Sequence, residues 1–443
     1  MNFKQIISLL LTLIILSTVV CIPYTAATDK MPDLLIGDAD GDGVITIMDA
    51  TAVALHLAKK SQLDEIHQQT AKTDFTTDVL SVIDATIIQQ KVADIKNKDT
   101  GEVGLPAFKY VKGEYVPALQ EYQKALDTII EKYNISGVAY VTRNGRVMCQ
   151  SATGMQNTEK GIEMTMDTLF PIGSISKQFC ATAVLMLQDQ GKLSVNDTID
   201  KYFPEYKYAS QITIHHLLSM RSGIYDYLND NPDAVELFSN TDDIRKAILD
   251  WIYAQELDFE PGEYWAYSNS NFYMLSDIVE QVSGVKYTDF IQTYILDELS
   301  MTNTGFYDDI AFDENVAERV IPQGVEYAPW VPGLSRGSGD LVSNAYDMDK
   351  WLTALGDGDL LSEESYKMMT TNYSGTFNYG YGLQVENKNR YWHGGDIDTY
   401  ESVDLIYAKD NLNIFMVTND LFGVWDQGIQ MHQLAKQLAV KIK

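Results

Sequence analysis

The sequence has little cysteine and little positive charge. Its 33 lysines and arginines are outnumbered by 62 aspartates and glutamates, which gives a formal net charge of −29. Because like charges repel, this imbalance argues against nucleic acids and anionic lipid surfaces as partners. We interpret the acidity as the charge that keeps an extracellular protein soluble.

Long apolar runs are also absent after residue 20, so we predict no membrane-spanning segment in the rest of the chain. Residues 1–4 carry one positive charge, residues 6–20 are almost wholly apolar, and the small residues Ala26 and Ala27 follow. This layout is typical of a signal peptide, which we assign to residues 1–27. We therefore expect secretion. A lipid anchor on Cys21 is less favoured because Val20 is large for a lipoprotein site.

Removal of residues 1–27 leaves two of the three cysteines, Cys149 and Cys180. Two cysteines in a secreted protein could pair. However, Cys149 lies in an expected strand and Cys180 in an expected apolar helix. We predict two buried free thiols.

A chain of 443 residues suggests two or three folded units. Asp-Ala-Thr occurs at residues 49–51 and again at 84–86, each time before an apolar helical pattern, which indicates an internal duplication. Residues 96–116 are polar and interrupted by glycine, so we predict a linker there. The remaining residues, 117–443, form the largest predicted domain.

Helix and strand patterns alternate within this domain. We predict helices over residues 119–133 and 425–441, and hairpins over 137–152 and 401–419, the first turning at Asn144-Gly145. Strands thus occur near both ends of the domain, with a mostly helical middle. We predict an α+β fold in which an antiparallel sheet, flanked by helices, lies beside a helical lobe.

Residues 38–49 have the pattern of a twelve-residue calcium loop. Calcium prefers six to eight oxygen ligands, and Gly43 stands sixth, where such a loop turns sharply. Alternate carboxylates, one backbone carbonyl and a closing carboxylate would supply the oxygens. The predicted ligands are Asp38, Asp40, Asp42, Val44 and Asp49.

This loop and the duplication resemble a dockerin, over residues 33–95, and the resemblance implies a small α-helical module. It also implies docking to a cohesin on a scaffoldin, as in a cellulosome, through loop positions ten and eleven: Ile47, Met48, Val82 and Ile83. In the second loop, one alignment puts Thr73, Phe75 and Thr77 at ligand positions. Another recruits Asp74, Thr76 and Asp78 but lacks the turn glycine, so calcium binding there stays open.

A candidate nucleophile, Ser174, precedes an expected helix over residues 178–190, and Lys177 follows it by three residues. Residues three apart on a helix share a face. A serine needs a partner that accepts its proton, and a desolvated lysine can be neutral enough to do so. The positive end of the helix would also favour a developing oxyanion.

Two further segments complete a pattern: Tyr267-Ser268-Asn269, and Trp392-His393-Gly394-Gly395 before the last hairpin. In this order the three segments resemble the serine β-lactamase and penicillin-binding-protein superfamily. Residues 216–227 (HLLSMRSGIYDY) and 339–343 (GDLVS) strengthen the likeness. They point to the class C-related branch, with its D-alanyl-D-alanine carboxypeptidases and esterases.

The resemblance implies that Ser174 forms the acyl-enzyme and that Lys177 and Tyr267 share the proton, with Tyr267 protonating the leaving group. Asn269 would orient Lys177 and the substrate amide, and His393 would stand where relatives often have lysine. Gly394 and Gly395 would let substrate approach the strand. The backbone amides of Ser174 and Asp396 would form the oxyanion hole, and catalysis would need no cofactor.

Two departures from the family pattern affect the substrate. Asp396 places a carboxylate where a peptide carboxylate would bind, and Thr399 replaces an expected glycine. Two carboxylates repel, so a substrate without a free carboxylate near Asp396 should bind better. We therefore expect hydrolysis of a neutral ester or amide that is related to peptides or to the cell wall. D-Ala-D-Ala carboxypeptidase or β-lactamase activity is the alternative.

Three other interpretations are less favoured. Gly333-Leu-Ser335-Arg-Gly337 matches an α/β-hydrolase nucleophile elbow, but its glycine and proline neighbours favour a loop. His215-His216 could bind a metal, but no suitably spaced ligand follows. A non-catalytic component that binds cohesin and holds a ligand in its cleft is the alternative of another class.

Overall fold

The computed structural model describes residues 116–310, 314–324 and 330–442, together with Ala39, residues 47–63, Ala71, residues 85–86 and residues 88–89. The predicted signal peptide and nearly all of the predicted linker lie outside the described residues. Among the described residues, no helix is both long and apolar enough to cross a membrane.

The described N-terminal residues include helix α2 (Ile47–Leu57). A small apolar core contains Ala50 and Val53 together with Ala85 and Ile88. These are equivalent positions of the two Asp-Ala-Thr segments, so both repeats contribute to one core. Asp49 is buried and its carboxylate accepts a hydrogen bond from the Ala39 amide at 2.7 Å.

The other predicted calcium ligands, Asp38, Asp40, Asp42 and Val44, lie outside the described residues, as do Val82 and Ile83. The predicted cohesin contacts Ile47 and Met48 are exposed.

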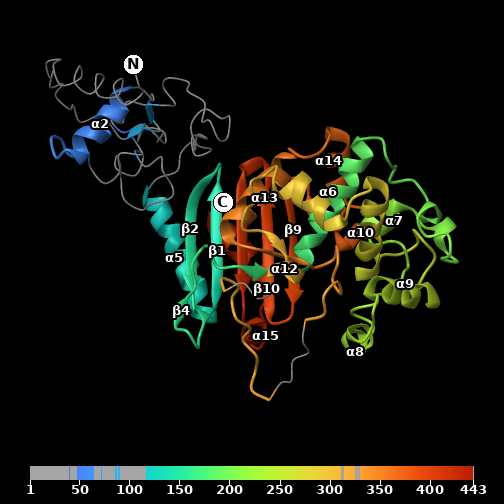
Figure 1. The fold of residues 1–443 in the computed structure, drawn as a ribbon. Helices are drawn as coiled ribbons and strands as arrows, with labels where there is room; N and C mark the ends of the chain where they lie inside the picture. The colour runs from blue at the N-terminus through green and yellow to red at the C-terminus, as the bar shows by residue number, and fades with distance from the viewer. Residues whose placement is uncertain are drawn as a thin grey trace. The chain divides into compact units, whose positions relative to one another are not determined.

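The main sheet is antiparallel and has the strand order β2-β1-β11-β10-β9-β8 (Figure 1). It therefore joins strands from both ends of the large domain, as predicted. Asn144 and Gly145 both have positive φ and close the first hairpin. The strands are β1 (Gly137–Arg143), β2 (Arg146–Thr153), β8 (Gln384–Asn387), β9 (Arg390–Ile397), β10 (Tyr400–Tyr407) and β11 (Leu412–Thr418).

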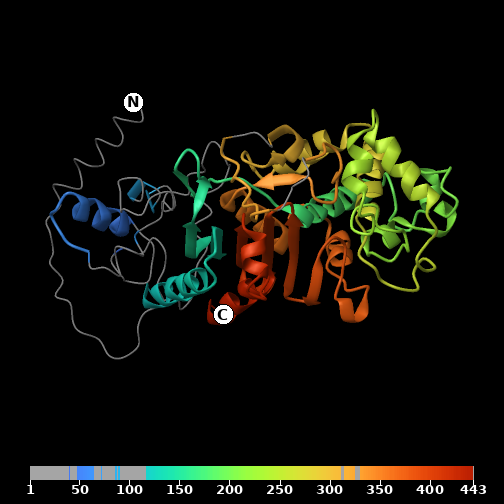
Figure 2. The same ribbon diagram turned by 90° about the horizontal axis from the view of Figure 1, so that it is seen from below.

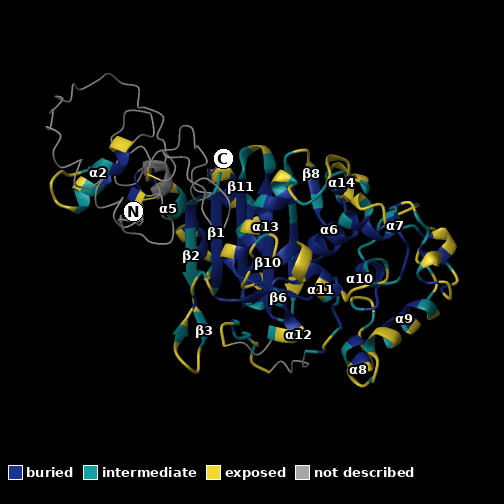
Figure 3. Ribbon diagram, turned by 45° about the horizontal axis from the view of Figure 1, so that its top comes forward, coloured by how far each residue is buried: buried dark blue, intermediate teal, exposed yellow. Residues whose placement is uncertain are grey.

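Helices cover both faces of this sheet. Successive side chains of β1 point to opposite faces, so they enter two different cores. Ala139 and Val141 pack in one core with α5 (Val116–Tyr133) and α16 (Met431–Ile442), which lie together on that face (Figure 2). Val138 and Tyr140 belong to the second core, with α6 (Ser176–Asp189) and α13 (Ala345–Asp357). The central strands are accordingly buried throughout (Figure 3).

The helical lobe is built from residues between β5 and β8. Its helices are α7 (Ile214–Leu218), α8 (Ala234–Ser239), α9 (Ile244–Ala254), α10 (Asn269–Ser283) and α11 (Tyr287–Ile291). The short helix α12 (Tyr307–Ile310) packs on β6 and β7, and α14 (Glu363–Met369) packs against α6. A π-helical turn, Gln292–Leu296, follows α11, and short 3-10 turns occupy Ile199–Lys201, Ala209–Gln211 and Gly375–Phe377. A further 3-10 turn, Ala408–Asp410, connects β10 to β11 in the main sheet.

Two small sheets complete the architecture. One pairs β3 (Met155–Asn157) with β4 (Ile162–Glu163). The other has the order β5-β7-β6 and contains β5 (Phe170–Pro171), β6 (Gly305–Phe306) and β7 (Leu341–Ser343).

Some predicted element bounds were wrong. The single C-terminal helix is two helices, α15 (Leu421–Trp425) and α16, because the chain turns at Gly428 with a φ of +69°. Helix α10 begins at Asn269, so Asn269 lies in its first turn. The prediction for the cysteines was correct, since Cys149 and Cys180 are both buried free thiols.

Candidate active site

Ser174 lies in a 3-10 turn, η2 (Gly173–Ile175), that runs directly into α6. The turn is fixed at its start by β5, where Pro171 pairs with Val342, and by the Ile172 amide, which donates to the Leu341 carbonyl at 3.0 Å. Ser174 thereby stands at the N-terminal end of a fourteen-residue helix. This position favours negative charge developing near the serine.

Lys177 lies one turn beyond Ser174, as the spacing predicts. Its ammonium nitrogen is 3.0 Å from the Ser174 hydroxyl oxygen, 2.8 Å from the Asn269 side-chain oxygen and 2.6 Å from the Ser338 carbonyl oxygen. The side chain is completely buried. Burial lowers the pKa of Lys177 to about 7, against the opposing effect of the Asp226 carboxylate. A neutral amine is therefore accessible near physiological pH.

Asn269 connects Lys177 to a buried carboxylate. Its side-chain nitrogen donates to the two Asp226 oxygens at 3.0 and 3.4 Å, while its oxygen accepts from Lys177. This orients the amide unambiguously. Asp226 also accepts from the Leu228 amide at 2.9 Å, and burial raises its pKa. Asp226 belongs to the motif at residues 216–227, but the sequence reasoning gave it no role.

Tyr267 lies beside Lys177. Its ring centre is 4.8 Å from the Lys177 nitrogen. Desolvation raises the pKa of Tyr267, and a hydrogen bond with Ser174 opposes the shift only in part. The phenol therefore keeps its proton over the working pH range, which suits a hydrogen-bond and proton donor.

His393 is buried on β9 and its surroundings define its tautomer. Its Nδ1 is 2.5 Å from the Gly394 carbonyl oxygen, which can only accept, so Nδ1 carries the proton. Nε2 then accepts from the Tyr379 hydroxyl at 3.0 Å. Burial, and then the Lys177 charge, lower the pKa of His393 to about 3. His393 is therefore neutral where relatives often have a charged lysine.

The turn that holds Ser174 packs closely against β9. A Cβ on Gly395 would approach the Ile172 carbonyl oxygen to 1.9 Å, and one on Gly173 would come within 3.0 Å of the Asp396 amide nitrogen. Gly173 also has a φ of +51°. Glycine at these two positions therefore lets the Asp396 amide lie next to the nucleophile turn, as the predicted oxyanion hole requires.

A cleft of about 360 Å³ borders this site, and the predicted site residues Lys177 and Gly395 lie behind its lining. Its lining includes the predicted site residues Ser174, Tyr267, Asn269, His393, Gly394 and Asp396. It also includes Glu401, which pairs with Asp396 across β9 and β10 and which the sequence reasoning missed. Desolvation by the surrounding protein raises the pKa of Asp396 to about 6, and burial raises the pKa of Glu401 to about 7.

The structure excludes the other sites that were weighed. Ser335 lies in a run of turns rather than between a strand and a helix, so the α/β-hydrolase elbow is absent there. His216 caps α7 and His215 contacts the Tyr381 hydroxyl at 2.6 Å. No cluster of potential metal ligands occurs among the described residues. Arg336, in the same run of turns, pairs with Asp277 at 2.8 Å and is therefore not available to a substrate carboxylate.

Comparison with known proteins agrees with this geometry. The family model described as Beta-lactamase matches residues 120–438. The chain belongs to this family of serine hydrolases. It is 31% identical over 309 residues to the "Putative penicillin-binding protein PbpX" of Bacillus subtilis (strain 168), covering 69% of this chain and 76% of that protein. It is 27% identical over 326 residues to "Penicillin-binding protein 4*" of the same strain, covering 67% and 71%.

Solved structures share the fold. The D-amino acid amidase from Ochrobactrum anthropi SV3, complexed with L-phenylalanine amide, superposes with a TM-score of 0.63 at 22% identity, over 74% of this chain and 98% of that one. The octameric penicillin-binding protein homologue from Pyrococcus abyssi has a TM-score of 0.61 at 23% identity, over 73% and 76%. The predicted mixed α and β fold is thus confirmed for the β-lactamase-like domain.

Proposed function

We propose that this protein is a secreted serine hydrolase that forms an acyl-enzyme on Ser174 and cleaves uncharged esters or amides. The supporting observation is the 3.0 Å contact between the Ser174 hydroxyl and the nitrogen of the buried Lys177. In the first step, neutral Lys177 takes the hydroxyl proton as the serine oxygen attacks the substrate carbonyl carbon. The Ser174 and Asp396 amides stabilise the resulting oxyanion.

Tyr267 then protonates the leaving alcohol or amine while the bond between this leaving group and the acyl carbon breaks. Lys177 returns the proton to Tyr267, which restores both groups. A water molecule next gives up a proton to neutral Lys177 and attacks the acyl carbon. Lys177 passes this proton to the Ser174 oxygen as the bond between that oxygen and the acyl carbon breaks, which releases the acid and restores both residues. No step requires a metal or an organic cofactor.

The charge of the cleft supports an uncharged substrate. Asp396 and Glu401 lie on one wall, and none of the described residues that line the cleft is lysine or arginine. Arg336 is held elsewhere by Asp277 and Glu280. A substrate with a free carboxylate near Asp396 would therefore meet repulsion without compensation.

We expect the enzyme to cleave an amidated D-Ala-D-Ala peptide about tenfold faster than the same peptide with a free carboxylate. Two like charges 4 Å apart at an effective dielectric of 20 repel by about 4 kcal/mol, and screening leaves about a third of this. Paired kcat/KM values at pH 8 test the expectation. The gap should narrow in Asp396→Thr, and in the native enzyme at pH 5, where Asp396 becomes protonated. Faster cleavage of the free carboxylate would restore the carboxypeptidase alternative.

A panel of p-nitrophenyl esters, amino acid amides and nitrocefin identifies the acyl group. The D-amino acid amidase shows only that the fold accommodates amide hydrolysis in that protein. Nitrocefin turnover above that of the esters would favour β-lactamase activity.

We further propose that residues 33–95 are a calcium-binding dockerin that attaches the enzyme to a cohesin on a scaffoldin, in a cellulosome. The duplication supports this module, because Ala50 and Ala85 share one core. The exposed Ile47 and Met48 offer an apolar contact for the cohesin.

Chelation is expected to abolish cohesin binding and leave hydrolysis nearly unchanged, because the loop carboxylates repel one another without a cation. Binding of the full chain to a cohesin panel is measured with EGTA, and again after Ca²⁺ or Mg²⁺ is added back. Only Ca²⁺ should restore binding. Equal loss of binding and hydrolysis would show that the two modules are not independent.

A further inference from the structure

The Ser338 carbonyl is the shortest of the three contacts to the Lys177 nitrogen, at 2.6 Å. It comes from residues 333–340, which we call the Arg336 loop. The loop lies between α10 and the nucleophile turn. A Cβ on Gly337 would lie 2.7 Å from the Phe272 carbonyl oxygen, and a Cβ on Gly339 would lie 3.6 Å from the Gly173 carbonyl carbon.

This carbonyl decides where the lone pair of Lys177 points. A neutral amine has two N–H donors and one lone pair. The Ser338 carbonyl and the Asn269 side-chain oxygen can only accept, so they take both N–H groups. The lone pair is then left for the third partner, the hydroxyl of Ser174. Losing the Ser338 carbonyl would free Lys177 to rotate away from the geometry needed for proton transfer.

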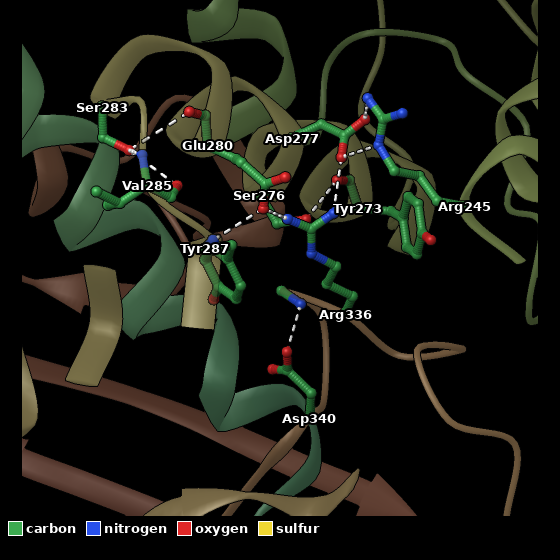
Figure 4. Close-up of polar contacts among 11 residues, drawn as sticks. Arg245, Tyr273, Ser276, Asp277, Glu280, Ser283, Val285, Tyr287, Arg336 and Asp340 are labelled. Carbon is green, nitrogen blue, oxygen red and sulfur yellow. Dashed lines mark hydrogen bonds and ion pairs between the residues drawn. The ribbon is translucent and has the colours of Figure 1, made fainter. Parts of the chain in front are cut away.

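Arg336 fastens the loop to α10 (Figure 4). Its guanidinium donates to the Asp277 carboxylate at 2.8 Å and to the Glu280 carboxylate at 2.6 Å. The Asp277 side chain is 1% exposed and is also bound by Arg245 from α9, at 2.7 Å. A guanidinium that binds one buried carboxylate, Asp277, and one half-exposed carboxylate, Glu280, holds a loop more firmly than a single exposed ion pair does.

The other side of the loop is fixed by its own backbone. The Asp340 carboxylate accepts from the Gly337 amide at 2.9 Å (Figure 4), and the Ser338 amide donates to the Ser335 carbonyl at 2.9 Å. These two contacts lie within the loop and shape it. Its ends are attached elsewhere, because the Gly333 amide donates to the Asp308 carboxylate at 2.9 Å, the Tyr307 amide donates to the Asp340 carbonyl at 2.7 Å, and the Tyr227 hydroxyl donates to the Leu334 carbonyl. Among the described ion pairs of the loop, those of Arg336 attach it to α10.

We propose that Arg336 is a positioning residue, which acts through the Ser338 carbonyl to aim and desolvate the catalytic base Lys177. The inference rests on the proposed function, since it assumes that Lys177 is the base. Arg336 itself points into the lobe and does not touch the substrate cleft.

The expected signature is a shift of the pH profile. Burial is the largest influence that lowers the pKa of Lys177, so a loosened loop that admits water raises this pKa toward its ordinary value. The rise of kcat/KM with pH then moves to higher pH. The titratable groups facing Lys177 are Asp226, Cys180, Asp340, Tyr267 and His393. The substitutions below keep all of these residues, and the Arg336 charge acts on two of them, since it lowers the pKa of Asp340 and of Cys180.

The test compares Arg336→Met with Arg245→Met, because both remove an arginine from Asp277 but only one releases the loop. We expect Arg336→Met to lower kcat/KM at least tenfold and to move the acidic limb upward by about one pH unit. Arg336→Lys, which keeps one ion pair, should recover part of both effects. Arg245→Met should stay within threefold of the native enzyme, with its limb unmoved.

An unmoved limb in a folded Arg336→Met overturns the inference, as does an equal shift in Arg245→Met. If Arg336→Met does not fold, Glu280→Gln removes one ion pair at a half-exposed carboxylate and should show a smaller shift in the same direction. No shift there also overturns it. Native enzyme that fails to label at Ser174 would instead overturn the proposed function, so the two failures are distinguishable.

Discussion

Ser174→Ala is expected to lose all covalent labelling by fluorophosphonate or fluorescent penicillin and to lower kcat by a factor on the order of 10⁴ or more. The reason is that Ser174 is the hydroxyl in contact with Lys177, at 3.0 Å. Without it, the cleft keeps its amide donors but no longer has an atom that can hold the acyl group. Labelling followed by gel fluorescence, and turnover of a p-nitrophenyl ester, measure the two losses.

Ser335→Ala is the matched control, because Ser335 lines the same cleft but lies in a run of turns. It should keep most of both labelling and turnover. Equal loss in this variant would revive the nucleophile-elbow interpretation. Native protein that neither labels nor turns over any ester or amide would support the non-catalytic, ligand-binding alternative.

The parts of the site that were predicted correctly are those with a local physical signal. Three residues separate Ser174 and Lys177, and a helical turn brings such a pair to one face. Asn144 and Gly145 tolerate positive φ, so the hairpin between β1 and β2 could be located from two letters. The hairpin predicted over residues 401–419 is the pair β10 and β11.

Tyr267, Asn269 and His393 required the family resemblance, because only the folded chain brings them near Ser174. Their motif spacing identified them, but no local pattern predicts contacts between residues so far apart. Ser338 could not be found at all. It contributes a backbone carbonyl, which every residue possesses, and its value comes from the position of its loop.

Charge partners were the other failure. The sequence does not indicate that Arg336 pairs with Asp277 and Glu280 on α10. Asp226 had no assigned role, although it anchors the amide that contacts Lys177. Ion pairs between distant elements depend on how the helices pack, and composition does not encode that. The helix predicted over residues 425–441 is too long, because Gly428 has a positive φ and separates α15 from α16.

The pKa of Lys177 determines how kcat/KM depends on pH. Burial alone would make a strongly weakened base, and the Asp226 carboxylate, acting toward Lys177 from beyond Asn269, restores part of its basicity. The resulting pKa of about 7 matches a general base to neutral working pH. Because the neutral form is the active one, kcat/KM of the native enzyme should rise tenfold per pH unit below 7. It should level above about pH 8.

Lys177→Met removes this base while keeping the length of the side chain, and we expect it to lower kcat/KM by about 10³-fold. The limb near pH 7 should vanish, because Tyr267, whose pKa is raised, cannot replace the amine as a base. Pre-steady-state acylation measured from pH 5 to pH 9 tests both effects, and a thermal melt verifies that the variant folds. Tyr267→Phe is the matched variant: it loses the proton donor, so it should slow leaving-group departure while keeping the limb. A Lys177→Met enzyme that retains a tenth of native activity with the same limb would mean that another group takes the Ser174 proton.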